Sequence, residues 1–340
     1  MHEERIDQRR IVFGPIGDAL RAIAPAGPIA VLGTARSLAA VPPAAFGDAD
    51  VVRYDGVQPH NPRTTVDAAG ALIDAHRCAS VVAVGSSSAM DLGKAVADRR
   101  DVLLILIPTA LGGAEMSRGY GVLEGDVKAG GRLRSAPPVV VYDPSLLASL
   151  PARELGSIGI NAWAHAIEAG YAKTEHLTGL AAAFLAGARL PPLLRTAARV
   201  RDEALHDGLF RGAHLAGYAL DTRSMGLHHA VCHVVGGLTQ IPHGIVNAIV
   251  LPRAVRVNAR LAPDAVEAVA DAFGIQDLAG EAETIASAYA LPRTLRELGV
   301  PADLVDRATP RVLASPLLAN NPAPVDEAAV RSVLTAAYAG

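Results

Sequence analysis

The sequence predicts an α/β domain followed by an all-helical domain, and two observations lead to this prediction. In the first half of the chain, short apolar runs alternate with segments of helical periodicity, the pattern of a parallel sheet with right-handed crossovers. After "VVVYDPSLLASLP" (139–151) strand-like runs almost disappear, and alanine-rich amphipathic helices continue to the end. We therefore expect a Rossmann-like parallel-sheet domain over residues 1–151 and a helical domain over 152–340.

The apolar runs of the first half define its strands, and the segments between them define its helices. We expect strands over 28–33, 50–56, 80–85 and 102–109. We expect helices over 35–41, 64–76 and 88–97, and a first helix of the second half over 159–172. The run "VLLILIPT" is apolar throughout, as a strand buried on both faces requires. Functional sites in such two-domain proteins are expected in the cleft between the domains.

Composition excludes several classes of function. The 340 residues carry a net charge of -3 with no cluster of Lys or Arg, which disfavours nucleic acid and anionic membranes as partners. Two cysteines, Cys78 and Cys232, make neither a disulfide framework nor a Cys-rich metal site. The N-terminus is charged, and no apolar segment of about 18 residues follows it, so we expect no membrane insertion and a cytoplasmic location.

Two loops that follow adjacent strands have the composition of nucleotide-binding loops. In "VAVGSSSAMDLGKAVA" (82–97), Ser86, Ser87 and Ser88 stand where a backbone approaches a phosphate at the start of a helix. A serine-capped turn without a ligand is the alternative for this segment alone. The next strand ends in "PTALGGAEMSRGYG" (108–121), whose Thr109 and Gly113 suit a second loop at the carboxyl edge of the sheet.

The stretch "LHHAVCHVVGGLTQIPHG" (227–244) is rich in histidine, and an earlier helix supplies matching partners. His229 and His233 are four residues apart, as are Asn161 and His165, so each pair lies on one helix face. His165, His229 and His243 with one oxygen ligand would make a divalent metal site, and an acid/base site is the alternative. Four other histidines are assigned to packing: His76, His176, His206 and His214.

These motifs resemble the iron-containing alcohol dehydrogenase superfamily, and most of all its maleylacetate reductase branch. The segment "PTALGGAEMS" is similar to that branch's "PTT-x-AGSEMT", and "GINAWAHAIEAGYA" is similar to its "MNAxAHxxEALYA". The segment "MGLHHAVCHVVGG" resembles its "LHHKLCHxLGG". The resemblance covers nearly the whole chain and implies a dinucleotide-binding domain followed by a helical catalytic domain.

Position by position, the resemblance implies a role for each motif residue. The four metal-ligand positions of metal-dependent relatives are occupied by Asn161, His165, His229 and His243. His233 matches the histidine near nicotinamide and substrate. The pyrophosphate loop "GGGSxxD" corresponds to Gly85, Ser86, Ser87, Ser88 and Asp91, and the second nucleotide loop to Thr109 and Gly113. Gly33 ends the first strand with no acidic residue for a ribose hydroxyl, and Arg36 is a candidate for a 2′-phosphate, so the expected cofactor is NADH or NADPH.

The chain departs from these patterns at informative positions. Asn161 offers a neutral amide where metal-dependent relatives have aspartate, so we expect no bound metal and regard the four ligand positions as vestigial. Ala230 stands where the reductase branch carries lysine, and "GSSS" replaces "GGGS". The segment "IPHG" resembles the metal-dependent relatives instead of the reductase's "LPHA".

The leading hypothesis is an NAD(P)H-dependent reductase of maleylacetate type, acting on a small oxo- or enoyl-acid. We expect His233 as general acid and His165, His229 and His243 as a polar, catalytic floor. Candidates for contacting a carboxylic acid substrate are Asn161, His228, Arg118 and Lys128. A metal-dependent alcohol dehydrogenase is one alternative, and a redox-inactive relative catalysing a non-redox biosynthetic step is another. By analogy with the family we expect a homodimer.

Overall fold

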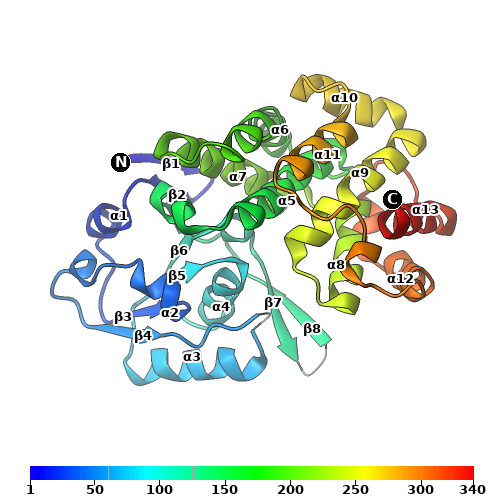
Figure 1. Ribbon diagram of the computed structural model, residues 1–340. Coiled ribbons are helices and arrows are strands. Elements are labelled where there is room, and N and C mark those ends of the chain that lie inside the picture. Colours follow the sequence, from blue (N-terminus) through cyan, green and yellow to red (C-terminus); the bar gives the residue numbers. More distant parts are fainter. Residues whose placement is uncertain (60, 125–126) are drawn as a thin grey trace. The chain divides into compact units, whose positions relative to one another are not determined.

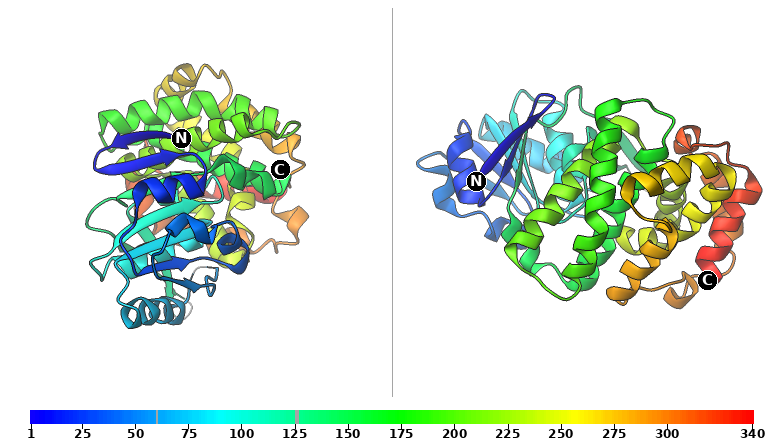
Figure 2. Two further views of the ribbon diagram at one scale, coloured as in Figure 1. Left: turned by 90° about the vertical axis from the view of Figure 1, so that its left-hand side faces the viewer. Right: turned by 90° about the horizontal axis from the view of Figure 1, so that it is seen from above.

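The computed structural model describes residues 1–59, 61–124 and 127–340, and the side chains of Val127 and Lys128 lie outside the described part. The chain forms two compact units. Unit 1 comprises Met1–Ser149 with Asp202–Phe210, and unit 2 comprises Leu150–Arg201 with Arg211–Gly340. All the strands of the described chain belong to unit 1, whereas unit 2 is built from helices (Figures 1 and 2).

Unit 1 is built on a seven-stranded sheet in the order β1-β2-β9-β6-β5-β3-β4. Its strands are β1 (His2–Ile6), β2 (Arg9–Phe13), β3 (Ile29–Leu32), β4 (Val51–Tyr54), β5 (Ser80–Gly85), β6 (Leu103–Pro108) and β9 (Val139–Tyr142). Every neighbouring pair is parallel except β1 with β2. Gly85 pairs with Pro108, so β5 and β6 end side by side and their following loops start together.

Helices cover both faces of this sheet, which explains why its central strands are apolar throughout. The helices are α1 (Ile16–Ile23), α2 (Ala35–Ala39), α3 (Arg63–Ala75) and α4 (Ser87–Ala97). In β3, Ile29 and Val31 pack with α1 and α2 on one face, and Ala30 and Leu32 pack with α3 and α4 on the other. The alternation follows from the two-residue period of a strand. A separate hairpin, β7 (Gly119–Glu124) with β8 (Val127–Arg132), packs against α4.

Unit 2 is an assembly of helices centred on α5 (Ala152–Tyr171). The others are α6 (Leu177–Ala197), α7 (Glu203–Arg223, whose first residues belong to unit 1), α8 (Leu227–Thr239), α9 (His243–Leu261), α10 (Pro263–Phe273), α11 (Leu278–Ala288), α12 (Leu304–Leu313) and α13 (Glu327–Ala339). Helix α5 contacts α6, α9, α10 and α11. Its buried Trp163 donates from Nε1 to the carbonyl of Gly187 in α6 at 3.1 Å. Helices α8, α9, α12 and α13 share a second apolar core.

The expected fold class is confirmed: a largely parallel α/β half precedes an all-helical half. The four expected strands and the helices between them are all present. The expected start of α5 was wrong, because the helix begins at Ala152, directly after Pro151, instead of at residue 159. The sequence reading also missed β1, β2 and the β7–β8 hairpin. The charged "HEERI" of β1 and the glycine-rich "VKAGGR" of β8 lack the long apolar run that marks a buried strand.

One described helix, α6, is long and apolar enough to cross a membrane by length and composition alone. This is weak evidence, because 44% of the apolar window is buried inside the protein and buried core helices have the same composition. Its contacts with α5 and the hydrogen bond from Trp163 favour a place in the core of unit 2.

Candidate active site

The turn after β5 in unit 1 has the geometry of an anion-binding loop. Gly85 adopts φ +148°, and a Cβ atom there would lie 2.8 Å from Cβ of Ala89, so only glycine fits. Ser86 precedes α4, and the first backbone N–H groups of that helix have no acceptor within the helix. The side chains of Ser86 and Ser87 are exposed, and that of Ser88 is half-buried. This turn therefore presents N–H groups and hydroxyls to an incoming phosphate.

The loop after β6 lies against this turn. The N–H of Thr109 donates to the carbonyl of Gly85 at 2.9 Å. A Cβ atom on Gly112 would come within 2.8 Å of Ser87 Oγ, and Gly113 adopts φ +75°. The two loops that the sequence singled out therefore form one continuous backbone surface at the carboxyl edge of the sheet.

Lys94 and Asp91 of α4 order the segment that follows these loops. Lys94 is fully buried, and its ammonium donates to the carbonyls of Ala114 (2.9 Å) and Gly119. Asp91 neutralises it at 3.2 Å and accepts the N–H of Gly121 at 3.2 Å. Asp91, predicted from the sequence to contact the cofactor, thus makes its described bonds to the protein itself.

At the end of β3, Gly33 allows close packing of the chain. A Cβ atom there would lie 2.9 Å from the carbonyl oxygen of Val84. Thr34 caps α2 in a reciprocal arrangement with Ser37. Arg36, the candidate for a 2′-phosphate, donates from Nη2 to the carbonyl of Ser149 at 2.8 Å and to Ser149 Oγ at 3.4 Å.

In unit 2, four histidines from three helices come together. His165 of α5 stacks on His229 of α8, with 4.8 Å between ring centroids. The rings of His233 and His243 are 6.0 and 6.1 Å from that of His229, and 5.7 Å from each other. The i, i+4 spacing on α8 and the position of His243 as the first residue of α9 produce this cluster.

Burial divides the cluster into two pairs. His165 and His229 are 4% and 1% exposed, whereas His233 and His243 are exposed. Burial lowers the pKa of both inner rings well below the usual value, and the neighbouring imidazoles lower it further. The inner pair is therefore neutral at neutral pH.

Glu168 of α5 organises the cluster and was not among the functional residues that the sequence singled out. Its Oε2 accepts from His229 Nδ1 at 2.6 Å, and its Oε1 accepts the backbone N–H of His228 at 2.8 Å. Burial raises the pKa of the Glu168 carboxyl, while backbone N–H donors from Gly226, His228 and His229 favour its ionised form. Its position three residues after His165, on the same helix face, was the available signal.

Hydrogen bonding fixes the proton positions of the two adjacent histidines. Asn247 donates from Nδ2 to the carbonyl of His243 at 2.7 Å, so its Oδ1 must accept from Nε2–H of His228 at 2.7 Å. His229 donates from Nδ1 to Glu168, which leaves a lone pair on Nε2. Asn161 Oδ1 lies 3.3 Å from that nitrogen, and rotation of the amide would present a donor there.

The expected substrate contacts have different surroundings. His228, an expected substrate contact, is fully buried between Asn247 and Cys232. Arg118 lies beside the β7–β8 hairpin in unit 1, where its carbonyl accepts the N–H of Leu133 at 3.0 Å. The side chain of Lys128 lies outside the described residues.

The donor set of the cluster offers a divalent metal only neutral ligands. Asn161 and the three histidines are all neutral ligands, with no anionic oxygen among them. Nδ1 of His165 is buried without a hydrogen-bond partner, whereas a metal-binding histidine normally donates its second N–H to an acceptor. Within residues 1–59, 61–124 and 127–340, no group of three or more His, Cys, Asp or Glu side chains is arranged to hold a metal ion.

Family models match most of the chain. The iron-containing alcohol dehydrogenase model matches residues 16–144, and the C-terminal model of the Fe-containing alcohol dehydrogenase family matches residues 157–338. The chain belongs to the iron-containing alcohol dehydrogenase family. The resemblance inferred from the sequence motifs is therefore confirmed. Because the chain belongs to this family, it is an oxidoreductase.

Several relatives of the chain are maleylacetate reductases. The chain is 35% identical to maleylacetate reductase of Sphingobium indicum over 91% of its own length and 86% of the relative's. It is 37% identical to that of Burkholderia cepacia, over 76% and 74% of the two chains. The crystal structure of maleylacetate reductase from Agrobacterium tumefaciens superimposes with a TM-score of 0.89 at 28% identity, covering 99% and 98% of the chains. The similarity to these relatives supports the classification of the chain as an NAD(P)H-dependent reductase.

The neutral, buried histidines predict a destabilising contribution to the free energy of unfolding in mild acid. Unfolded histidine takes up a proton near pH 6.5, whereas folded His165, His228 and His229, whose pKa values are lowered by burial, do not. At these three residues the unfolded state therefore binds more protons below pH 6.5, and each histidine lowers the free energy of unfolding by about 1 kcal/mol as pH drops from about 7.5 to about 5.5. Glu115 acts in the opposite direction over the same pH range, because burial raises its pKa in the folded state to about 7 and it takes up a proton there before it does so in the unfolded state.

Urea denaturation across this pH range measures the effect. His165→Gln should remove the contribution of one histidine, about 1 kcal/mol between these pH values, and the exposed His76→Gln should leave the pH dependence unchanged. The same pH dependence in the wild type and in folded His165→Gln would contradict the neutral assignment of His165.

Proposed function

We propose that this protein is an NAD(P)H-dependent reductase of maleylacetate type, which reduces a small oxo- or enoyl-acid. The observation that carries the proposal is the divided histidine cluster, with a neutral inner pair fixed by Glu168 and an exposed outer pair. Similarity to maleylacetate reductases over most of the chain supports the same conclusion.

Unit 1 carries a cradle that suits a dinucleotide. The glycine-only position at Gly85, the open start of α4 and the adjoining loop at Thr109 to Gly113 suit a pyrophosphate. When bound, a reduced nicotinamide supplies a hydride. The absence of an acidic side chain beside Gly33 leaves both NADH and NADPH as candidates, with Arg36 placed next to this turn for a 2′-phosphate.

We assign the proton transfer to His233. A general acid must carry a proton at neutral pH and recover it from solvent. The inner rings of His165 and His229 are neutral and buried, which excludes them as the acid. His233 is exposed and lies on the same face of α8 as His229. We propose that His165, His229 and His243, with Asn161, form the polar floor that orients the substrate oxygen.

We further propose that the reaction needs no metal. The neutral donor set and the unpartnered Nδ1 of His165 are the observations behind this proposal. Turnover should then survive incubation with a chelator. We also propose that the protein is a cytoplasmic homodimer and that its substrate is a small carboxylic acid. Arg118 and Lys128 are candidates for binding the substrate carboxylate.

The proposal predicts binding and oxidation of a reduced nicotinamide cofactor. Calorimetric titration with NADH and NADPH should give a Kd of about 1 mM or tighter for at least one of them. That cofactor should be oxidised when maleylacetate is added. Gly85→Ala should weaken binding at least about tenfold, because the new Cβ atom meets Ala89 and the φ angle is unfavourable.

Gly17→Ala is the matched control, since its Cβ would make only ordinary contacts, the nearest at 3.4 Å. Binding of neither cofactor at millimolar concentration would contradict the proposal and favour a redox-inactive relative.

Replacement of the proposed acid predicts a selective loss of turnover. His233→Gln should lower kcat by about 10²- to 10⁴-fold because the proton donor is removed. Its cofactor affinity should match that of the wild type, since the cradle lies in unit 1. His76→Gln serves as the control for histidine replacement at an exposed position. Full turnover by His233→Gln, measured in the same assay, would exclude this residue as the acid.

A further inference from the structure

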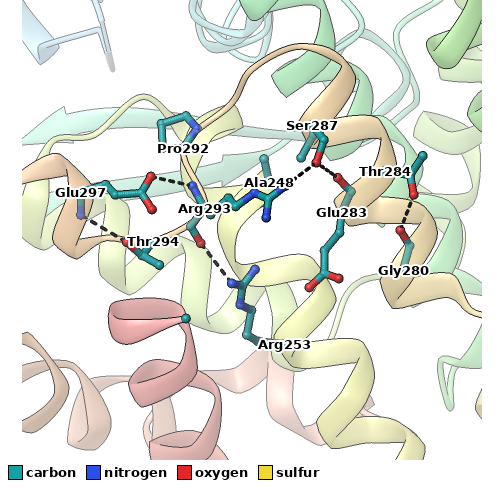
Figure 3. A pocket seen from close by; sticks show the side chains of 12 residues that line it. Ala248, Arg253, Gly280, Glu283, Thr284, Ser287, Pro292, Arg293, Thr294 and Glu297 are labelled. Atoms are coloured by element: carbon teal, nitrogen blue, oxygen red, sulfur yellow. Dashed lines mark hydrogen bonds between the residues drawn. The ribbon is translucent and has the colours of Figure 1, made fainter.

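Unit 2 contains a cavity of about 630 Å³ that the reductase site does not use. It is lined by α9, by α11, by the segment that follows α11 and by Gly340 after α13 (Figure 3). Ala248 and Pro292 provide apolar surface, and Arg253, Glu283, Ser287 and Arg293 provide polar groups. Arg253 comes ten residues after His243 on α9, which places it about 15 Å further along the helix. The cavity is therefore distinct from the histidine cluster.

Arg253 is a half-buried cation with no carboxylate partner among the described residues. Its guanidinium donates to the carbonyls of Ile249 and Arg293, both at 3.1 Å. Burial lowers its pKa, and the nearby Arg256 and Arg293 act in the same direction, against Glu283 and Glu297. A guanidinium has five N–H donors, so three remain for a ligand.

Arg293 adds a second guanidinium on the exposed side of the cavity. Its side chain donates from Nη2 to Ser287 Oγ at 3.0 Å. It forms no ion pair within the described part of the chain, and four of its N–H donors remain. Figure 3 shows Arg253 of α9 and Arg293 of the segment after α11 on the same side of the cavity.

The two carboxylates of the cavity are already engaged. Glu283 forms a bidentate pair with Arg256, at 2.7 and 2.8 Å. Glu297 accepts the backbone N–H of Arg293 at 3.0 Å. Arg256 neutralises Glu283, so Arg253 and Arg293 are balanced in part by Glu297, and the side chains of the cavity together with Arg256 carry one net positive charge.

We propose that this cavity binds a small organic oxyanion, through a carboxylate or phosphate group held by Arg253 and Arg293. Planar guanidinium groups match the paired oxygens of both anions. The volume is that of a small-molecule site and exceeds what a bare inorganic ion requires. Ala248 and Pro292 are available to an apolar part of the ligand. This site is independent of the proposed reductase activity.

Calorimetric titration with succinate and, separately, with inorganic phosphate tests the proposal. At least one probe should bind with a Kd of about 1 mM or tighter. Arg253→Gln and Arg293→Gln should each weaken that binding at least about tenfold, since each removes one charged fork. Arg260→Gln, an exposed position on the same helix, should leave it unchanged. The probe that binds identifies the anion as carboxylate or phosphate.

Two further measurements distinguish loss of the binding site from misfolding of a variant and from binding at the histidine cluster. Thermal unfolding checks that each variant is folded, and the exposed Arg293→Gln provides a test if Arg253→Gln is destabilised. Binding should persist in His233→Gln, because that residue belongs to the histidine cluster. Failure of both probes to bind the wild type, or equal binding by the wild type and folded Arg293→Gln, would overturn the proposal. Binding lost only in His233→Gln would also overturn it.

Discussion

The placement of the histidines depends on one buried carboxylate. Helix α8 begins after Gly226 without a side-chain cap of its own, so its first N–H groups need acceptors from elsewhere. Glu168 of α5 accepts from His228 and His229, and Asn321 Oδ1 accepts from Leu227 at 3.2 Å. The positive end of the α8 dipole favours the negative carboxylate at this position. The same carboxylate receives Nδ1–H of His229, which joins the start of the helix to the chemistry of the cluster.

This arrangement separates two tasks within the cluster. Burial lowers the pKa of both inner rings, and Glu168 orients that of His229, which suits them to the role of fixed hydrogen-bonding groups that we propose. The outer rings are exposed. Where a metal is bound, a cation can polarise the substrate oxygen, whereas the positioning that we propose here is assigned to neutral hydrogen-bonding groups.

Much of the fold follows from local sequence patterns. The apolar runs of β3, β5 and β6 and the i, i+4 histidines of α8 depend on strand and helix periodicity, which a single sequence displays. The roles of Lys94 and Glu168 depend instead on partners far along the chain, such as Gly119 and His228. Charged residues are normally exposed, so their burial becomes visible only when those partners are placed. The burial of His228 was missed for the same reason, because it follows from Asn247 on another helix.

The protonation state of His229 tests this account most directly. Nuclear magnetic resonance of protein labelled with ¹⁵N-histidine distinguishes the two neutral tautomers from the imidazolium form, and His229→Gln identifies the signal. At neutral pH we expect a neutral ring with the proton on Nδ1, shared with Glu168, and a bare Nε2. An imidazolium at His229, or a neutral ring with its proton on Nε2, would contradict the role assigned to Glu168 and the neutral inner pair.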